Sequence, residues 1–209
     1  MYTPPAFRVD DRAEIHAMMR ACRLATLVTA TAEGLLATPL PLILAEEEGE
    51  FGVLHGHLAR ANPQWQKAAI GEAMVLFDGP DAYVTPSWYE TKRETGKVVP
   101  TWNYQAVHAY GPAEFFDEPA RLLDAVTRLT NLHEGTQAEP WAVDDAPPAF
   151  VQAQLRGIVG LRIPITRLEG KRKMSQNRPL ADRLGVAEGL GASERPSDLV
   201  VAAMVPTEG

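Results

Sequence analysis

Short segments with strand character follow one another through tight turns along much of this chain, and this succession limits the folds open to it. Alternating residues that suit a pleated surface occupy Ala25–Thr31, Phe51–His57 and Ala73–Asp78. Turn residues follow two of these segments, at Ala32-Glu33-Gly34 and Gly79-Pro80-Asp81. Helical patterns are inserted between strands without alternating strictly with them. We therefore predict an antiparallel β-barrel with peripheral helices, of the α+β class, and not a parallel doubly wound sheet.

Prolines mark the places where two longer strand segments are interrupted. Leu35–Ala45 contains Pro39 and Pro41. Because a central strand cannot lose two backbone donors, we expect this strand to be bulged or to lie near a sheet edge. Val98–Phe116 alternates over most of its length, and Gly111-Pro112 predicts a bend within it.

Helical periodicity and end signals predict the helices of the chain. They are a helix from Asp10 or Asp11 to about Arg23, a helix that begins at Pro63, and the segments Pro119–Glu134 and Pro147–Arg156. Between two strands, the polar run of residues 86–97 predicts an irregular loop that exposes Trp88 and Tyr89.

The end of the chain has weaker patterns than the rest. We expect residues 1–184 to form the barrel domain and residues 185–209 to form a C-terminal tail. Within this tail, Gly185–Arg195 is typical of a mobile linker, and Ser197–Met204 of a short helix.

Composition narrows the classes of protein to which the chain can belong. With 209 residues, of which 45% are hydrophobic, it can bury a core without disulfides. Cys22 is the single cysteine, which excludes a disulfide framework. No apolar run approaches the length of a membrane span, so we expect a soluble, cytoplasmic protein. The net charge of −7 does not favour non-specific binding to nucleic acid, although a local basic patch could still bind nucleic acid despite that charge.

The stretch Phe51–Trp65 combines a strand, a turn and a helix start. Asn62 can cap free backbone N–H groups, and Pro63 suits the first helical position. A helix N-terminus presents unpaired donors, and the guanidinium of Arg60 adds a bidentate fork. This combination suits a phosphate or a carboxylate. The alternative is that Arg60 lies in solvent and that Asn62 only caps.

His55 and His57 lie two residues apart on a strand, so their side chains face the same side. A metal site would need a further ligand, for which His108 is a candidate. Histidines that are hydrogen-bonded in a pocket or in the core are the favoured interpretation. We identify no catalytic constellation, because no His–Asp arrangement accompanies the serines and Cys22 lies on an apolar helical face.

Two further segments concentrate unusual polar residues. Trp102 and Tyr104 share one face of a strand, with Asn103 opposite, and suit a flat heteroaromatic ligand or an ordinary barrel wall. The run from Lys171 to Arg178 has enough positive charge for an anionic ligand or a nucleic-acid backbone, and its alternative is a solvated loop.

Four blocks in order resemble the PaiB family, whose members are described as FMN-binding negative transcriptional regulators. They are G-H-L-A-R-A-N-P-Q-W from Gly56, G-P-D-A-Y-V-T-P-S-W-Y from Gly79, V-P-T-W-N-Y-Q-A-V-H-A-Y-G from Val99 and G-K-R-K-M-S-Q-N-R from Gly170. The opening M-Y-T-P-P-A-F and the strand A-T-P-L-P-L are similar as well. The resemblance extends to about Leu190.

This resemblance implies a split β-barrel that forms a homodimer with FMN between the subunits. The strand end and turn His55-Gly56-His57 to Arg60, followed by the cap Asn62, would hold the ribityl phosphate, with Arg60 as the charged partner. The segment Thr38-Pro39-Leu40-Pro41 would run past the isoalloxazine edge. The remaining residues, from the same or the second subunit, would close the site: Trp102, Asn103, Lys173, Ser175, Gln176 and Asn177.

The resemblance leaves the activity open, because one fold hosts several functions. The leading hypothesis is an FMN-binding homodimer of the PaiB type that acts as a negative transcriptional regulator. DNA binding would depend on local patches, since no helix-turn-helix is recognisable. The alternatives are a flavin-dependent oxidoreductase that acts on a small molecule, and a barrel that serves only as a dimeric interaction module.

Overall fold

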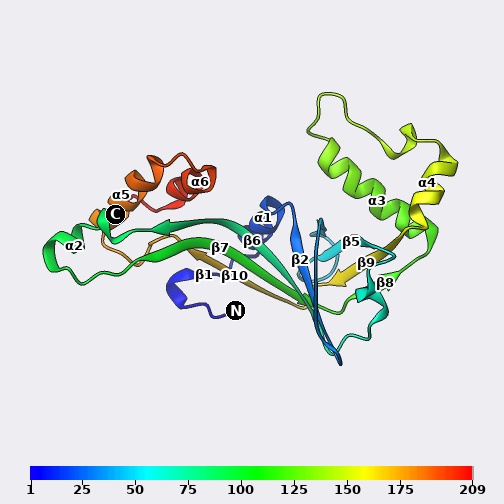
Figure 1. Cartoon of the computed structure of the whole chain (residues 1–209), viewed down its shortest axis with the longest axis horizontal. Coiled ribbons are helices and arrows are strands. Elements are labelled where there is room, and N and C mark those ends of the chain that lie inside the picture. The colour runs from blue at the N-terminus through cyan, green and yellow to red at the C-terminus, as the bar shows by residue number, and fades with distance from the viewer. Residues whose placement is uncertain (209) are drawn as a thin grey trace. The chain divides into compact units, whose positions relative to one another are not determined.

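A computed structural model describes residues 1–208 of the chain, shown in Figure 1. The chain divides into two compact units. Unit 1 comprises Met1–Met18, Asp78–Val107 and Glu169–Gly209, and unit 2 comprises Met19–Phe77 and His108–Leu168. Helix α1 (Arg12–Ala21) and strands β6 (Ala73–Val84), β7 (Thr101–Gly111) and β10 (Arg167–Lys173) run from one unit into the other. No helix in the described part of the chain is both long and apolar enough to cross a bilayer.

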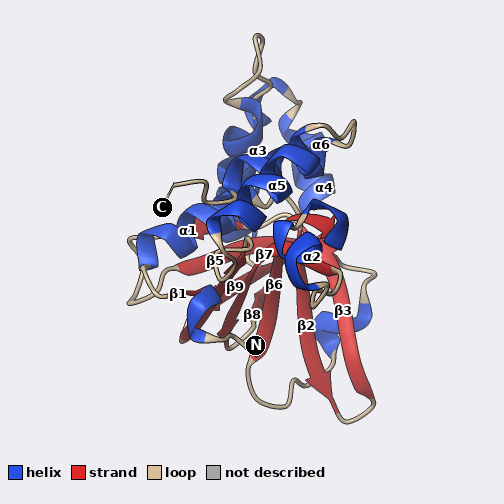
Figure 2. Cartoon of the chain, turned by 90° about the vertical axis from the view of Figure 1, so that its left-hand side faces the viewer, coloured by secondary structure: helices blue, strands red, loops and turns tan. Residues whose placement is uncertain are grey.

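A long hairpin forms one wall of unit 2 (Figure 2). Strand β2 (Ala25–Thr31) pairs antiparallel with β3 (Gly34–Leu40), from Ala25 opposite Leu40 to Thr31 opposite Gly34. On its other side, β2 pairs with the first part of β6. Strand β3 is therefore the last strand of its sheet. This edge position confirms the prediction made from Pro39, whose missing N–H would interrupt a central strand.

A second antiparallel sheet lies wholly within unit 2. Its strands follow the order β4 (Ile43–Ala45), β5 (Val53–Ala59), β9 (Ile158–Pro164) and β8 (Glu114–Phe116). Alternate residues of β5 and β9, including Leu54, Leu58, Leu161 and Ile163, are buried in the core. The 16-residue helix α3 (Pro119–Glu134) contacts β5 and β9, and α4 (Pro148–Leu155) packs on α3 and β9. The helix predicted over Pro119–Glu134 is confirmed.

Unit 1 contains strands and the C-terminal helices. Its neighbouring strands follow the order β1 (Arg8–Val9), β10, β7 and β6. Helices α2 (Glu90–Thr95), α5 (Leu180–Gly191) and α6 (Pro196–Met204) belong to this unit. Its core is a cluster that includes Tyr89, Met174, Val186, Leu190 and Val201.

Two strands expected from the sequence are divided in the structure. Leu35–Ala45 forms β3 and β4, which belong to different sheets, and Val98–Phe116 forms β7 and β8. In both segments the break coincides with a proline, at Pro41 and at Pro112. A proline at the end of a strand removes a ladder donor and allows the chain to change sheets.

The turn expected at Gly79-Pro80-Asp81 is wrong, because β6 continues through these residues. A Cβ atom at Gly79 would lie 2.8 Å from the Cβ atom of Gln105 on β7. Gly79 therefore allows two strands to approach each other closely. It does not mark a reversal of the chain.

The irregular loop expected over residues 86–97 is also wrong. These residues form a short 3₁₀ helix (Pro86–Trp88) and α2, and Tyr89 is only 1% exposed. The linker expected over Gly185–Arg195 is wrong for the same reason, because α5 covers most of it and Val186 and Leu190 are buried in the same cluster as Tyr89. The domain boundary that we expected after residue 184 falls within α5. The short terminal helix is confirmed as α6.

Candidate functional site

The corner that follows β5 in unit 2 consists of residues 59–66. Asn62 caps a 3₁₀ helix, Pro63–Gln66, by accepting a hydrogen bond from the backbone N–H of Gln64. The capping role of Asn62 and the helix start at Pro63 are confirmed, but the helix is a 3₁₀ turn that ends after four residues. A single 3₁₀ turn has little of the dipole of a long helix. Any affinity for an anion at this corner must therefore come from side chains.

Arg60 is fixed by backbone carbonyls on the neighbouring chain segment. Its Nε donates to the carbonyl of Arg156 at 2.9 Å, and its Nη2 donates to the carbonyl of Ile158 at 3.1 Å. Its own backbone N–H donates to Gly157. These bonds use the inner edge of the guanidinium and leave its Nη1 edge outside, where the carboxylate of Asp117 lies 3.6 Å away. The fork is held in one orientation before any ligand arrives.

The Arg60 side chain is 36% exposed. Unit 2 has cavities of about 390 and 430 Å³, and Arg60 lines neither of them. The ring of Trp65 lies 5.8 Å from the guanidinium carbon, and its indole N–H donates to the Arg60 carbonyl. An anion at this corner would therefore meet an open surface and not an enclosed pocket.

Gln64 is the residue that ties the corner to the β2–β3 hairpin, and it is only 2% exposed. Its Oε1 accepts from the hydroxyl of Thr38 at 2.5 Å, and its Nε2 donates to the hydroxyl of Thr29 at 3.0 Å. Asn62 completes the network by donating to the Thr38 oxygen at 2.8 Å. The structure thus brings Thr38 and Asn62 together, as predicted members of one site. Gln64 and Thr29 were not foreseen.

Successive side chains of the segment Thr38-Pro39-Leu40-Pro41 lie in different environments. Thr38 takes part in the Gln64 network, Leu40 is buried and Pro39 is exposed on the edge strand. A Cβ atom at Gly56 would lie 3.0 Å from the Pro41 carbonyl oxygen and 2.6 Å from the side chain of Leu42. Gly56 therefore allows β5 to approach this segment closely.

His55 and His57 face the side of the β5–β9 sheet that α3 covers. His55 lies opposite Arg162 and lines a cavity together with residues of α3, and its Nε2 lies 3.0 Å from a Glu48 oxygen. His57 shares this face by strand alternation. Its Nδ1 is buried without a hydrogen-bond partner, and burial lowers the pKa of its imidazole. Among residues 1–208, no group of three His, Cys, Asp or Glu side chains could hold a metal ion.

In unit 1, the segment from Lys173 to Arg178 folds into a tight loop against the start of β7. Ser175 has a positive φ of 61° and exchanges hydrogen bonds with the fully buried amide of Asn103, at 3.0 and 3.1 Å. The side chain of Gln176 accepts from the N–H of Met174 and donates to the carbonyl of Arg172. Asn177 is exposed. These bonds hold a strained conformation that an isolated loop would avoid.

Lys173 and its neighbours form a cluster of positive charges. The Lys173 ammonium donates to the Thr101 hydroxyl at 2.6 Å and to the Trp102 carbonyl. Burial lowers its pKa, and the charges of Lys171 and Arg178 lower it further. Lys171 is only 7% exposed and donates to the carbonyl of Tyr2.

Aromatic rings, and not carboxylates, surround this cluster. The Lys171 ammonium lies 5.0 Å from the ring centre of Tyr104, and the Arg178 guanidinium lies 4.7 Å from that of Tyr89. Within residues 1–208, no carboxylate forms an ion pair with Lys171, Lys173 or Arg178. Trp102 is half exposed and meets Tyr83 edge to face. A buried positive charge without a counter-ion favours an anionic ligand.

The structure thus gathers the predicted residues into two groups, one in each unit. Thr38, Gly56, Arg60 and Asn62 lie around the corner of unit 2, and Trp102, Asn103, Lys173 and Ser175 lie around the loop of unit 1. Lys171 was foreseen only as part of a basic run. Its burial depends on Tyr2 and Tyr104, which no local pattern reveals.

A family model and a similar protein of known sequence both match most of this chain. A family model described as "Putative FMN-binding domain" matches residues 1–167. The "Protease synthase and sporulation protein PAI 2" of Bacillus subtilis (strain 168) is 34% identical over 198 residues, which cover 94% of this chain and 92% of that protein.

Solved structures show the same fold at low identity. The FAD and heme binding protein from Mycobacterium smegmatis has a TM-score of 0.57 and 16% identity, covering 79% of this chain and 73% of that one. The flavocytochrome Anf3 from Azotobacter vinelandii has a TM-score of 0.56 and 13% identity, covering 79% and 69%. The predicted split-barrel type of fold is confirmed by these likenesses, with the strands of residues 1–208 arranged in two antiparallel sheets and in no closed barrel.

The family model covers nearly all of unit 2 and the first two segments of unit 1, ends before the loop that follows β10, and names the flavin nucleotide that the resemblance implies. FMN is therefore confirmed as the cofactor of this family, and the resemblance seen in the four sequence blocks is confirmed by the relative from Bacillus. The chain belongs to the PaiB family of proteins with an FMN-binding domain.

Proposed function

We propose that this chain forms a cytoplasmic homodimer that holds FMN at the subunit interface and acts as a negative transcriptional regulator of the PaiB type. The observation that carries the proposal is the preorganised guanidinium of Arg60. Two carbonyls fix its inner edge, and its Nη1 edge faces outward. A phosphate monoester can accept from that edge without any rearrangement of the side chain.

The donors present fit an FMN phosphate. Arg60 supplies the charge and an outward donor edge, and the Gln64 network, in which Thr38 and Asn62 already have partners, ties this corner to the β2–β3 hairpin. When it is bound, FMN supplies hydride or single-electron transfer, while the protein supplies binding and orientation. Pro39 and the neighbouring backbone of the edge strand are the groups that we assign to the isoalloxazine. His57, whose buried Nδ1 lacks a partner, holds a neutral imidazole near the same strand end.

Two features of unit 2 support a dimer. Strand β3 ends its sheet, so within residues 1–208 one row of its backbone groups has no strand beside it. Leu35 on this strand is 75% exposed. A second copy that covers β3 would bury this side chain. Trp102 and the loop from Lys173 to Asn177, which the buried Asn103 holds in place, would then reach the flavin from the partner subunit.

An absorbance spectrum of the purified protein, followed by titration with FMN, tests the cofactor and its stoichiometry. We expect flavin bands and one FMN per chain, with a mass of two chains by light scattering. Protein that stays colourless after incubation with FMN and desalting would overturn the proposal. A flavin-loaded monomer would overturn the dimer alone.

The cationic cluster of unit 1 supports a role in binding phosphate groups of nucleic acid, despite the net charge of −7 of the whole chain. Selection from a pool of random-sequence DNA duplexes, followed by affinity measurements at several salt concentrations, tests this role. We expect an enriched sequence whose affinity falls steeply with salt. Equal retention of all sequences would argue against a specific regulator.

The same cluster favours one alternative, a flavin-dependent oxidoreductase. Reduced nicotinamide donors carry a pyrophosphate, for which Lys173 and Arg178 are suitable partners. Steady oxidation of NADH or NADPH by the FMN-loaded protein, without sequence-selective DNA binding, would favour this alternative. DNA selection without turnover would favour the regulator.

A further inference from the structure

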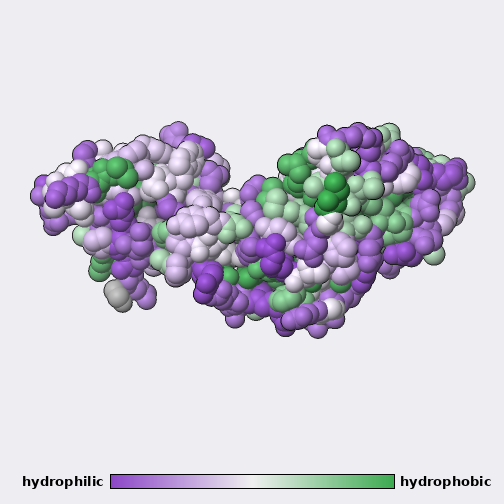
Figure 3. All heavy atoms as spheres, turned by 90° about the horizontal axis from the view of Figure 1, so that it is seen from below, coloured by the Kyte–Doolittle hydropathy of each residue, from purple (hydrophilic) through white to green (hydrophobic). Residues whose placement is uncertain are grey.

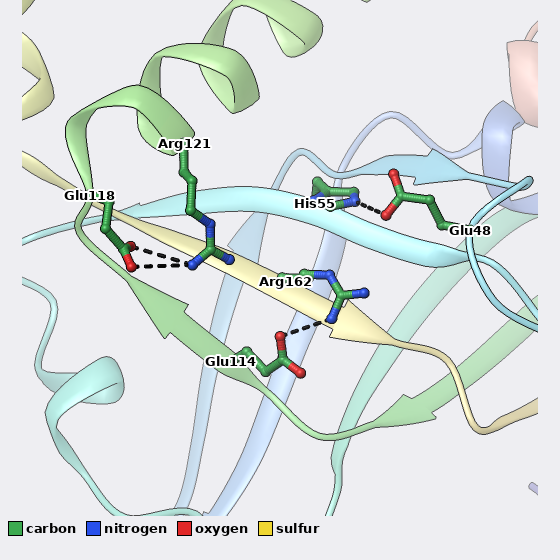
Figure 4. A network of polar contacts seen from close by, with 6 residues as sticks. All are labelled: Glu48, His55, Glu114, Glu118, Arg121 and Arg162. Atoms are coloured by element: carbon green, nitrogen blue, oxygen red, sulfur yellow. Dashed lines mark hydrogen bonds and ion pairs between the residues drawn. The ribbon is translucent and has the colours of Figure 1, made fainter.

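A cavity of about 390 Å³ in unit 2 is lined by no residue of the Arg60 corner, although Asp117, the neighbour of its lining residue Phe116, lies 3.6 Å from Arg60. Its walls come from β5, β8, β9 and the first turns of α3, and Figure 4 shows the polar side chains around it. Its size is within the range of small-molecule sites. His55, Arg162 and Arg121 line it from three different elements, and Phe116 adds an apolar wall.

Strand register explains why these side chains meet. His55 on β5 lies opposite Arg162 on β9, and Arg162 lies opposite Glu114 on β8. Residues that are directly opposite each other project to the same face of a sheet. The three side chains therefore form a row across the face that α3 covers, and Arg121 reaches down to this row from the helix (Figure 4).

Both arginines keep most of their donors available. The Nη1 atom of Arg162 donates to Glu114 at 2.9 Å, and the Nη1 atom of Arg121 lies 3.4 Å from both oxygens of Glu118. Within residues 1–208, the Nε and Nη2 atoms of the two arginines have no hydrogen-bond partner. The ring of Phe116 supports the Arg121 guanidinium at 4.0 Å.

The acidic partners of these arginines are on the solvent side. The side chains of Glu114 and Glu118 are 47% and 59% exposed, and neither lines the cavity. Exposed ion pairs of this kind contribute little, so a bound anion can replace them. Asp124, the carboxylate that does line the cavity, is 67% exposed and lies 3.8 Å from Arg128.

The start of α3 adds to the positive potential. The helix has 16 residues, and its N-cap, Glu118, makes no side-chain capping bond. Ala120 of the first turn lines the cavity, so the free N–H end of the helix is next to the two guanidiniums.

From this arrangement, we propose that the cavity binds a small organic anion through a carboxylate or phosphate group held between Arg121 and Arg162. The body of the ligand contacts Phe116 and the alanines of α3, and His55 lines the cavity from β5. No residue of the Arg60 corner lines this cavity, so the site is distinct from the flavin-phosphate site proposed above.

Isothermal titration of the FMN-loaded protein with inorganic phosphate and with citrate, in HEPES buffer at constant ionic strength, tests the site. We expect saturable binding of at least one probe, and the tighter probe identifies the preferred group. Arg121→Gln and Arg162→Gln should each weaken binding by about tenfold or more, the usual loss for a charged hydrogen bond. Arg156→Gln removes the same charge from an exposed side chain of unit 2 that lines no cavity, and should leave binding unchanged.

Backbone amide shifts of the wild-type protein provide a readout that needs no variant. Both probes should shift the resonances of Ala120 and Ala125 more than those of residues at the Arg60 corner. The absence of saturable binding for both probes, or equal affinity in Arg156→Gln and the two cavity variants, would overturn the proposal. So would shifts that are centred on the Arg60 corner.

Discussion

The corner after β5 and the loop after β10 both concentrate polar residues, but they satisfy these residues in opposite ways. At the corner, Gln64, Thr38 and Asn62 use one another as partners, and Arg60 is held by two carbonyls. In the loop, Asn103 and Ser175 are paired, but the positive charges of Lys171 and Lys173 lie close together without a carboxylate.

The corner is therefore a hydrogen-bonded frame that leaves only the outer edge of Arg60 for a ligand, whereas the loop holds positive charges that no carboxylate within residues 1–208 pairs with. Hydrogen bonds that are complete within the chain fix a shape and add stability, and removing one leaves buried groups unsatisfied. Like charges held together cost stability until an anion arrives. We therefore expect substitutions at Gln64 to affect mainly folding, and substitutions at Lys173 to affect mainly anion binding and the pH dependence of stability.

The largest effect should come from Gln64→Leu. This change removes the bonds to Thr29 and Thr38, so that the buried Thr29 hydroxyl loses its partner and Thr38 keeps only its bond from Asn62, which together costs about 2–4 kcal/mol. Urea unfolding measures the loss. Gln66→Leu is a matched control, because the same change two residues later affects an exposed side chain and should cost less than about 0.5 kcal/mol. Equal losses in the two variants would show that the corner is not a frame.

Arg60→Ala should weaken FMN binding by about tenfold to a hundredfold, since one charged contact to the phosphate is lost. Fluorescence titration with FMN measures the change, with Arg156→Ala as the control for loss of an arginine nearby. An Arg60→Ala protein that retains wild-type affinity would remove the corner from the cofactor site and leave the cationic loop as the phosphate-binding region.

Lys173→Met should change the dependence of stability on pH. The pKa of Lys173 is lower in the folded chain than its usual 10.5, so the unfolded chain binds more protons as the pH approaches that value. The wild-type protein should therefore gain stability relative to Lys173→Met as the pH rises from 7 toward 10.5. Thermal unfolding in this range, with the exposed Lys97→Met as control, measures the gain. A difference that falls with pH would contradict the positive cluster.

Asp117→Asn should have the smallest effect. Its carboxylate is 69% exposed and lies 3.6 Å from Arg60, so the pair contributes about 0–1 kcal/mol to stability. Because an acidic neighbour opposes a bound phosphate, FMN affinity should rise slightly in the variant. The same fluorescence titration measures this rise, and a clear loss of affinity would indicate that Asp117 orients Arg60.

Local sequence patterns were sufficient to predict elements in which buried residues recur at a regular interval. Strand β2 and helix α3 lie where alternation and apolar spacing predict them, and the Asn62 cap follows from the Asn-Pro pair. Local patterns were not sufficient where a contact from a distant part of the chain decides the outcome. Tyr89 has a polar sequence around it, yet it is buried because Val186 and Leu190 cover it.

The candidate site divides in the same way. That His55 and His57 share a face followed from their spacing alone. The partner of Gln64 is Thr29, 35 residues earlier on another strand, and no spacing rule connects them. Likewise, the lowered pKa of Lys173 depends on the positions of Lys171 and Arg178 around a folded loop, and not on the number of charges in the sequence.

The glycines of α5 have a consequence for the dynamics of unit 1. A Cβ atom at Gly185 would lie 2.0 Å from the carbonyl oxygen of Trp88, and one at Gly189 would lie 2.3 Å from its indole ring. Each glycine lowers the intrinsic helicity of the segment by about 1 kcal/mol relative to alanine. Packing against Trp88 and α6, and not its own propensity, therefore holds the helix. Amide hydrogens of α5 and of the Trp88 region should exchange with deuterium together, as one cooperative unit that opens before the neighbouring strands do.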